Sequence, residues 1–291
     1  MVEDVSIAFW GPKGSGKSSM IYSFGYAVTR KYEPQNGLRV FLREIDGKTP
    51  VFIDKPSSIK EIRDGTEDYT IKNWKIGRTP EGRLNPIARH LKRASTFTHD
   101  IAFFDDKGAR LVELVNGRKL FSEQQFARAR SMLVNAHNTI ILLDPSLLDD
   151  SELEVGVEVS KYTRDEYRNF VKTLCRMIWK ERNAPGRFAV CFTKSDKLNL
   201  GRVERAKADD ENKWGLIEDE FGPEMVAFFH SQVQHEIKPF IVSSMKDDKD
   251  AWDPDDVELP IFWLLEKTEL EILQPKQKKR YLKYPISRDS R

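Results

Sequence analysis

Apolar residues recur along the chain in runs that fit buried β-strands. The first run is MVEDVSIAFW, in which Val5, Ile7 and Phe9 lie on one face and Ala8 and Trp10 on the other. A strand that is apolar on both faces suits a parallel sheet covered by helices on either side. Four later runs have the same character: HDIAFFD near 99–105, NTIILLD at 138–144, RFAVCFT at 187–193 and KPFIVSS at 238–244.

Stretches with helical spacing separate these strands. Residues 17–32 place apolar side chains at Met20, Ile21, Phe24 and Ala27–Val28, on one face of a helix. The other predicted helices lie at about 120–136, 163–182, 215–235 and 256–272. Strands that alternate with helices predict an α/β sheet whose strands are joined by crossovers.

The pattern between the first helix and residue 99 is weaker. We predict a hairpin over 38–54, in which the Asp46–Gly47 turn pair joins LRVFLRE to TPVFIDK. Residues 55–99 are polar and interrupted by glycines and prolines, and one strand is predicted there through IARHLKR. From Lys72 to Arg93 there are seven Lys or Arg residues and one acid, a charge that could serve the phosphates of a nucleotide.

Composition narrows the class of protein. The 291 residues are 39% hydrophobic and 32% charged, so there is enough apolar content for a folded core. The net charge of +2 provides no global field that favours nucleic acid or an anionic membrane. The two cysteines, Cys175 and Cys191, exclude a disulfide scaffold and a four-cysteine zinc site. No apolar run reaches the roughly 20 residues of a membrane helix, and the first residues include acids where a signal peptide has bases, so we expect a cytoplasmic protein.

Charge changes sign near the C-terminus. Residues 246–258 carry seven acids and two lysines, and residues 276–291 carry seven basic residues and one acid. We expect a solvated acidic loop followed by a basic tail, at 273–291, without fixed structure. Binding of this tail to anionic lipid or RNA stays an alternative.

Residues 11–18, GPKGSGKS, match the phosphate-loop pattern G-x-x-x-x-G-K-[ST]. Glycines allow the backbone to curl until successive N–H groups face one point, and the start of a helix adds its unpaired N–H groups and its dipole. Lys17 would bring a positive charge to the terminal phosphates, as a catalytic residue, and the Ser18 hydroxyl could bind Mg²⁺. The predicted nucleotide contacts are Gly11, Pro12, Lys13, Gly14, Ser15, Gly16, Lys17, Ser18 and Ser19.

The strand HDIAFFD ends in Asp105 and is followed by Gly108. A carboxylate after an apolar strand is the usual second half of a phosphate-loop site, where it holds Mg²⁺. The glycine three residues later could place an N–H near a γ-phosphate. The same D-x-x-G spacing recurs at Asp219–Gly222, within a predicted helix, and we interpret that second match as structural.

Two later strands end in residues suited to a guanine base. Thr193–Asp196 reads TKSD and fits the guanine-selective pattern [NT]-K-x-D, whose aspartate accepts hydrogen bonds from the ring N–H and the exocyclic amine. Small residues after KPFIV would allow a backbone N–H to approach the guanine oxygen. The predicted base contacts are Thr193, Lys194, Asp196, Ser243, Ser244 and Met245.

The four motifs stand in order, each after a predicted strand, and ligands of open α/β sheets bind outside those strand ends. Over about residues 4–272 the chain resembles the Ras-like P-loop GTPases of the translation-factor-related (TRAFAC) class. GPKGSGKS and TIILLDPS are most similar to the prokaryotic double-GTPase group. The resemblance implies a three-layer P-loop NTPase sandwich with a mostly parallel six-stranded sheet, one antiparallel edge strand, and GTP or GDP with Mg²⁺ as ligands.

The resemblance also implies a switch threonine that binds Mg²⁺. Thr66, Thr70, Thr79, Thr96 and Thr98 lie in the permitted gap, and we favour Thr79 because glycines and a proline surround it, as in a mobile loop. A turn residue is the equal alternative for Thr79.

The water-orienting glutamine of many relatives is replaced by Ala109, so slow hydrolysis is expected. Arg78 is a candidate arginine finger, with an exposed surface arginine as the alternative.

We expect a GTPase domain over 1–272 with insertions near 33–70 and 147–162. The favoured function is a Mg²⁺-dependent GTP/GDP molecular switch that acts on an unknown protein effector or regulator, with a nucleotide-dependent dimer as one further option. A nucleotide-binding module with negligible hydrolysis and an ATP-dependent P-loop enzyme are the alternatives.

Overall fold

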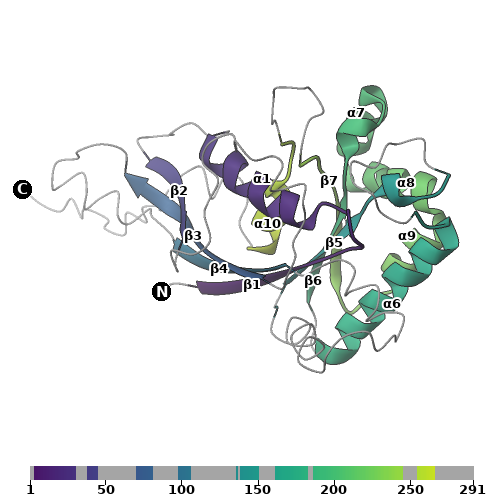
Figure 1. The fold of residues 1–291 in the computed structure, drawn as a ribbon, viewed down its shortest axis with the longest axis horizontal. Coiled ribbons are helices and arrows are strands. Elements are labelled where there is room, and N and C mark those ends of the chain that lie inside the picture. Colours follow the sequence, from purple (N-terminus) through teal and green to yellow (C-terminus); the bar gives the residue numbers. More distant parts are fainter. Residues whose placement is uncertain are drawn as a thin grey trace, which may run out of the picture.

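In the part of the chain that the structure describes, the strands form one mixed sheet (Figure 1). The computed structural model describes residues 3–30, 38–44, 70–80, 98–105, 136, 138–150, 161–182, 186–244 and 254–265. The strands in this part of the chain are β1 (Glu3–Trp10), β2 (Leu38–Glu44), β3 (Thr70–Pro80), β4 (Thr98–Asp105), β5 (Asn138–Leu143), β6 (Arg187–Phe192) and β7 (Glu236–Ile241). Their order across the sheet is β2-β3-β4-β1-β5-β6-β7.

Five neighbouring strands, from β4 to β7, are parallel, and this confirms the predicted α/β fold. The prediction of six strands with an antiparallel edge is wrong in its detail, because the described residues form seven. Strand β3 runs antiparallel to β4, but β2 pairs outside it and takes the edge. The reversed strand therefore lies one position in from the edge, and β2 runs in the direction of the five parallel strands.

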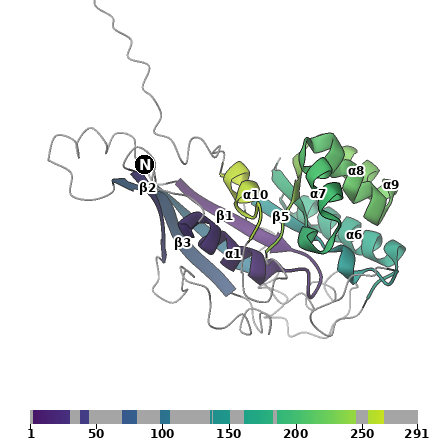
Figure 2. The ribbon, with the colours of Figure 1, turned by 90° about the horizontal axis from the view of Figure 1, so that it is seen from above.

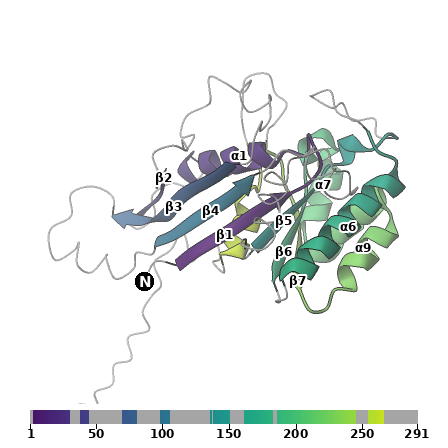
Figure 3. The same cartoon turned by 60° about the horizontal axis from the view of Figure 1, so that its bottom comes forward.

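Two helical layers cover the sheet, one on each face. The described helices are α1 (Lys17–Arg30), α6 (Arg164–Arg182), α7 (Leu200–Lys207), α8 (Asp210–Phe221), α9 (Pro223–His230) and α10 (Glu258–Leu264). Figure 2 shows α1 and α10 together on one face, and Figure 3 shows α6 beside α9 on the other. None of these described helices is long and apolar enough to cross a membrane.

The alternation predicted for the first strand assigns its side chains to two separate cores. Ile7 and Phe9 are fully buried against α1 and α10, and Ala8 and Trp10 are fully buried on the face that α6, α8 and α9 cover. The α1 side chains that gave the helical pattern, at positions 20, 21, 24, 27 and 28, are all buried. Burial on both faces is what allows β1 to occupy the middle of a parallel sheet.

The region after α1 differs from the prediction. Residues 38–44 form a strand as expected, but the antiparallel partner of this strand is β3, with Leu42 opposite Ile76. Strand β3 lies where no strand was predicted, because TIKNWKIGRTP intersperses its apolar residues with charged ones and lacks a continuous apolar run. The predicted second half of the hairpin and the predicted strand through 87–93 lie outside the described residues, as does most of the helix predicted over 120–136.

The helix predicted over 215–235 is two helices. Gly222 ends α8 with φ of 86°, and Pro223 follows at the first position of α9. A left-handed glycine followed by proline is a strong helix stop and restart, because proline lacks the N–H that a continuing helix needs. The break turns α9 back onto α8, and both helices contribute to the same core.

Candidate functional site

The candidate site lies at the edge of the sheet where the parallel strands end. Residues 11–18 connect the end of β1 to the start of α1. Because β4, β5, β6 and β7 run in the same direction as β1, their carboxyl ends lie at this same edge. The sheet thus brings together motifs that are separated by more than 200 residues in the sequence.

The phosphate loop has the backbone geometry that its glycines allow. Gly14 and Gly16 have φ of 85° and 89°, in the left-handed region that side chains other than glycine rarely adopt. Gly11 has no room for a side chain, since a Cβ there would lie 2.5 Å from the Ser15 Oγ and 3.2 Å from the Leu142 carbonyl oxygen. The first glycine of the motif is therefore fixed by packing on β5, and the others are fixed by conformation.

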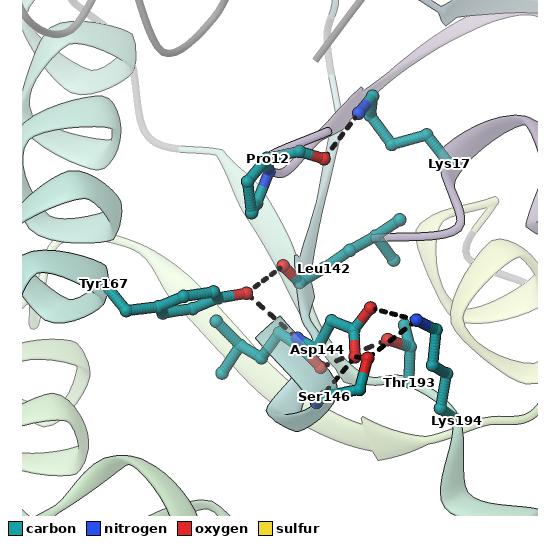
Figure 4. Close-up of polar contacts among 9 residues, drawn as sticks. Pro12, Lys17, Leu142, Asp144, Ser146, Tyr167, Thr193 and Lys194 are labelled. Carbon is teal, nitrogen blue, oxygen red and sulfur yellow. Dashed lines mark hydrogen bonds and ion pairs between the residues drawn. The ribbon is translucent and has the colours of Figure 1, made fainter. Parts of the chain in front are cut away.

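Lys17 is held inside this loop. The residue is 94% buried, and its Nζ donates hydrogen bonds of 3.0 Å to the carbonyl oxygens of Gly11 and Pro12. Figure 4 shows the contact with Pro12. Lys13 is exposed, and Ser18 and Ser19 are partly buried in the first turn of α1. A lysine charge that folds back over a curled loop at a helix start is suited to a polyphosphate.

Two residues predicted to bind Mg²⁺ lie at this same edge of the sheet. Ser18 is the second residue of α1, and Asp105 is placed by its backbone as the last residue of β4, next to β1. A hydroxyl and a carboxylate at these places fit the preference of Mg²⁺ for oxygen ligands and phosphate. Among the described residues no group of three or more His, Cys, Asp or Glu is placed to hold a metal ion. Gly108 and Met245 lie outside the described residues.

The structure does not bring Arg78 and Thr79 to the phosphate loop. Both residues lie in β3, where Gly77 pairs with Thr98 at the start of β4. They therefore lie at the opposite end of the sheet, at least the length of β1 from the loop, or about 25 Å at the rise of an extended strand. In place of the mobile loop expected around Thr79, the chain is a paired strand.

Thr70, and not Thr79, lies at the edge of the sheet that carries the phosphate loop. It is the first residue of β3 and pairs with Asp105 at the carboxyl end of β4. Because β3 is antiparallel to β4, its start and not its end lies at the edge of the phosphate loop. The antiparallel direction of β3, which the sequence pattern did not reveal, accounts for the misplacement of Thr79.

The TKSD segment follows β6 and begins with two fixed residues. The Thr193 N–H donates to the Leu143 carbonyl oxygen at 2.8 Å, and the Thr193 hydroxyl donates to the same oxygen at 3.3 Å. Lys194 has φ of 57° and ψ of 36°, after which Ser195–Lys197 forms a short 3₁₀ helix. This turn places Asp196 beside the end of β7.

Asp196 and Ser243 meet directly. The Ser243 hydroxyl donates a short hydrogen bond to Asp196 Oδ1, and the Ser195 N–H donates to the Val242 carbonyl oxygen at 3.4 Å. The neighbouring Ser244 is tied to the phosphate-loop helix, because the Ser23 hydroxyl donates to its carbonyl oxygen at 2.6 Å. Asp196, Ser243 and Ser244, three of the predicted base contacts, thus lie together, and the Ser23–Ser244 hydrogen bond connects them to α1.

A buried polar network at the end of β5 was not predicted as part of the site (Figure 4). Asp144 is fully buried, and its carboxylate accepts hydrogen bonds from the Ser146 N–H at 2.9 Å and from the Ser146 hydroxyl at 2.7 Å. Lys194 Nζ lies 2.8 Å from Asp144 Oδ2 and 2.8 Å from the Ser146 hydroxyl oxygen. The sequence signal was present in TIILLDPS, an apolar strand that ends in aspartate before proline and serine.

Tyr167 of α6 completes this network. Its hydroxyl accepts a hydrogen bond from the Asp144 N–H at 2.9 Å and donates to the Leu142 carbonyl oxygen at 3.5 Å. Burial, and next the charge of Asp144, raise the pKa of Tyr167 well above its ordinary value. The tyrosine therefore stays neutral and joins α6 to the carboxyl end of β5.

The two ends of the insertion predicted near 147–162 lie side by side. Leu148 and Tyr162 form an isolated parallel bridge, in which the Asp149 N–H donates to the Tyr162 carbonyl oxygen at 2.8 Å. The Tyr162 N–H donates to the Leu147 carbonyl oxygen, also at 2.8 Å. The two ends of this segment are thus held next to the Asp144 network.

Comparison with known proteins adds two distant structures. No family model and no curated protein matches the sequence. A bacterial selenocysteine-specific elongation factor, EF-Sec, is similar at 13% identity and a TM-score of 0.38 over 91% of this chain, which spans only 29% of that one. The signal recognition particle receptor SRb-GTP/SRX complex from Chaetomium thermophilum is similar at 13% identity and a TM-score of 0.42 over 85% of this chain and 94% of that one. At these scores neither likeness adds to the site, which rests on the geometry of the chain itself.

Proposed function

We propose that this chain binds GTP and GDP with Mg²⁺ at the sheet edge formed by residues 11–18, 193–196 and 243–244, and that it is a slow GTP hydrolase acting as a molecular switch. The observation that carries the proposal is the contact between Asp196 and Ser243 at the strand ends that neighbour the phosphate loop. A phosphate loop alone would accept any nucleotide. A carboxylate that a serine orients at this place adds a means to recognise the base.

Guanine is the base that this carboxylate favours. Its ring N–H and exocyclic amine are two adjacent donors, which one carboxylate can accept together, and adenine offers no such pair. A site built for two donors leaves a charge without partners when the wrong base enters, and discrimination by such sites reaches about 10⁴-fold. The Lys194 side chain is one quarter exposed, and its aliphatic part would cover the plane of the base.

The phosphate half of the proposal assigns roles to residues of the loop and the neighbouring strands. The loop N–H groups and Lys17 would hold the phosphates, and Ser18 and Asp105 would hold Mg²⁺. The cation would neutralise charge on the transferred phosphoryl group. Thr70, which pairs with Asp105, replaces Thr79 as the proposed switch threonine, and Arg78 is not part of this proposal.

A nucleotide-binding module with negligible hydrolysis is the second candidate. Ala109 occupies the position where many relatives in the resembling class have glutamine, so no side chain there can orient the attacking water. A turnover assay separates the two candidates: release of phosphate from GTP by wild-type protein, absent in a Lys17→Ala variant, supports the switch. Tight GTP binding without release supports the module.

Equilibrium binding of fluorescent GDP and ADP analogues tests the proposed ligand. We expect a strong preference for GDP that weakens when EDTA removes Mg²⁺. Asp196→Asn should move the preference from guanine to xanthine nucleotides. Asp219→Asn is the matched control, because Asp219 of α8 belongs to the second D-x-x-G match and pairs with Arg202 of α7 at 2.9 Å. Equal binding of ADP, or no shift with Asp196→Asn, would refute the guanine assignment.

A further inference from the structure

The segment that follows β7 is closed by backbone pairing between Ser243 and Asp255. Ser243 and Asp255 form an isolated antiparallel bridge: the Ser243 N–H donates to the Asp255 carbonyl oxygen at 3.0 Å, and the Asp255 N–H donates to the Ser243 carbonyl oxygen at 2.8 Å. Asp256 follows with φ of 55°, a left-handed conformation that few residues other than glycine adopt. A conformation of this kind persists only where neighbouring contacts hold it.

Lys207 supplies such a contact. It is the last residue of α7, and its Nζ lies 2.5 Å from Asp255 Oδ2 and 2.7 Å from Asp256 Oδ2. The lysine side chain is 21% exposed, so water screens these ion pairs less than it would on an open surface. Burial by itself would lower the pKa of Lys207, but the two carboxylates outweigh it and the pKa is raised, which keeps the ammonium charged.

Asp255 is connected to the Asp196 carboxylate through one residue, Ser243. Ser243 pairs with Asp255 through its backbone and donates to Asp196 through its hydroxyl. Helix α7 also begins four residues after Asp196, at Leu200, and it packs against β7. Lys207 therefore joins the helix that follows Asp196 to the segment that follows Ser243.

We propose that Lys207 is a positioning residue for base recognition, which holds Ser243 against Asp196 through its ion pairs with Asp255 and Asp256. This inference rests on the proposed guanine-nucleotide function. Asp196 must accept two hydrogen bonds in the plane of the base, so a small rotation of its carboxylate costs base selectivity. The phosphate loop follows another strand, β1, so loss of the Lys207 ion pairs should affect recognition of the base more than binding of the phosphates.

The ratio of GDP to IDP affinity measures this effect, because hypoxanthine keeps the ring N–H and lacks the exocyclic amine. In Lys207→Gln we expect GDP affinity to fall about three- to tenfold, the range that the loss of one hydrogen bond implies. IDP affinity should fall less, so that the ratio narrows. Lys207→Arg should restore the ratio, since it keeps the charge.

Lys213→Gln is the matched control. Lys213 is 17% exposed and pairs with Asp210 at 2.7 Å within α8, so it resembles Lys207 in burial and in ion pairing. Asp255→Asn is the second test variant, since that side chain is 54% exposed and its backbone bridge is retained. We expect Lys213→Gln to keep the wild-type ratio and Asp255→Asn to narrow it. Thermal melting of each variant confirms that it is folded.

Two different results would overturn the inference. If wild-type protein prefers GDP to ADP but Lys207→Gln and Asp255→Asn keep its GDP-to-IDP affinity ratio, Lys207 does not position Asp196. The proposed function then stands. If GDP and IDP affinities fall by the same factor, Lys207 has only a structural role. If wild-type protein does not prefer GDP to ADP, the proposed function fails and this inference fails with it.

Discussion

Lys194 and Asp144 form an ion pair of 2.8 Å between two strand ends, and Asp144 is fully buried. The two residues are fifty positions apart, and the parallel register of β5 and β6, with Leu143 opposite Phe192, brings them together. Each has further partners in Ser146, so the carboxylate and the ammonium are both compensated. The lysine of the TKSD motif is therefore fixed by a residue outside that motif.

Removing the lysine should destabilise the protein more than removing both charges. Lys194→Met leaves a buried carboxylate without its cation, and we expect the free energy of unfolding to fall by about 3 kcal/mol. Asp144→Asn in the same background should recover most of this loss, since it removes the uncompensated charge. Urea denaturation of the two single variants and the double variant measures the coupling. Strictly additive effects would show that the pair contributes nothing to stability.

Alkaline pH should destabilise the protein through three buried groups. Burial raises the pKa values of the Cys175 and Cys191 thiols, and burial followed by the charge of Asp144 raises that of Tyr167. In the unfolded chain these thiols lose their protons from about pH 8.5, but the folded protein keeps them, so stability falls as pH rises. Above about pH 8.5, each thiol lowers the free energy of unfolding by about 1.4 kcal/mol per pH unit.

Chemical denaturation between pH 7 and 10 tests this dependence on pH. Cys191→Ala should be less stable at pH 7, because it leaves a small cavity, but its stability should fall less steeply with pH. An unchanged slope in Cys191→Ala would mean that the thiol is not protected in the folded state. The measurement needs no nucleotide and is independent of the proposed function.

The register of β3 predicts which threonine responds to the γ-phosphate. Thr70 pairs with Asp105 at the loop edge, and Thr79 lies at the opposite end of the sheet. Thr70→Ala should weaken the binding of a non-hydrolysable GTP analogue about tenfold with Mg²⁺ present and leave GDP affinity nearly unchanged, as expected for the loss of one cation ligand. Thr79→Ala and Arg78→Ala should alter neither affinity. The reverse result would restore the assignment that the sequence pattern favoured.

The sequence revealed those parts of the fold that depend on local pattern. Continuous apolar runs identified β1, β5 and β6, because a strand buried on both faces is built mainly from apolar residues. Strand β3 was missed because only its pairing with β2 and β4 makes it a strand, and its own residues alternate weakly. The extra edge strand and the direction of β3 are properties of pairing that no single segment carries.

The same distinction applies to the site. The phosphate loop and the TKSD segment have their chemistry in adjacent residues, and the structure places both at the carboxyl edge of the sheet. The ion pairs of Lys194 with Asp144 and of Lys207 with Asp255 and Asp256 join residues about fifty positions apart. They can be recognised only when the pairing of the strands is known. Thr79 was favoured for its surrounding glycines and proline, a signal of turns that strand pairing overrides.

The effect of an added methyl group should differ between Gly11 and Gly215. A Cβ at Gly11 would meet the Ser15 Oγ at 2.5 Å and Leu142 at 3.2 Å, and these atoms belong to the loop and to the centre of the sheet. Gly11→Ala should therefore shift Ser15 and the phosphate loop and weaken the binding of GDP. Gly215 lies inside α8, and a methyl group added there would meet no atom within 4 Å, so Gly215→Ala should keep full binding and raise the free energy of unfolding by about 0.5–1 kcal/mol. Calorimetric titration with GDP and urea denaturation of both variants provide the comparison, and intact binding by Gly11→Ala would show that the loop can move away from β5 at no cost.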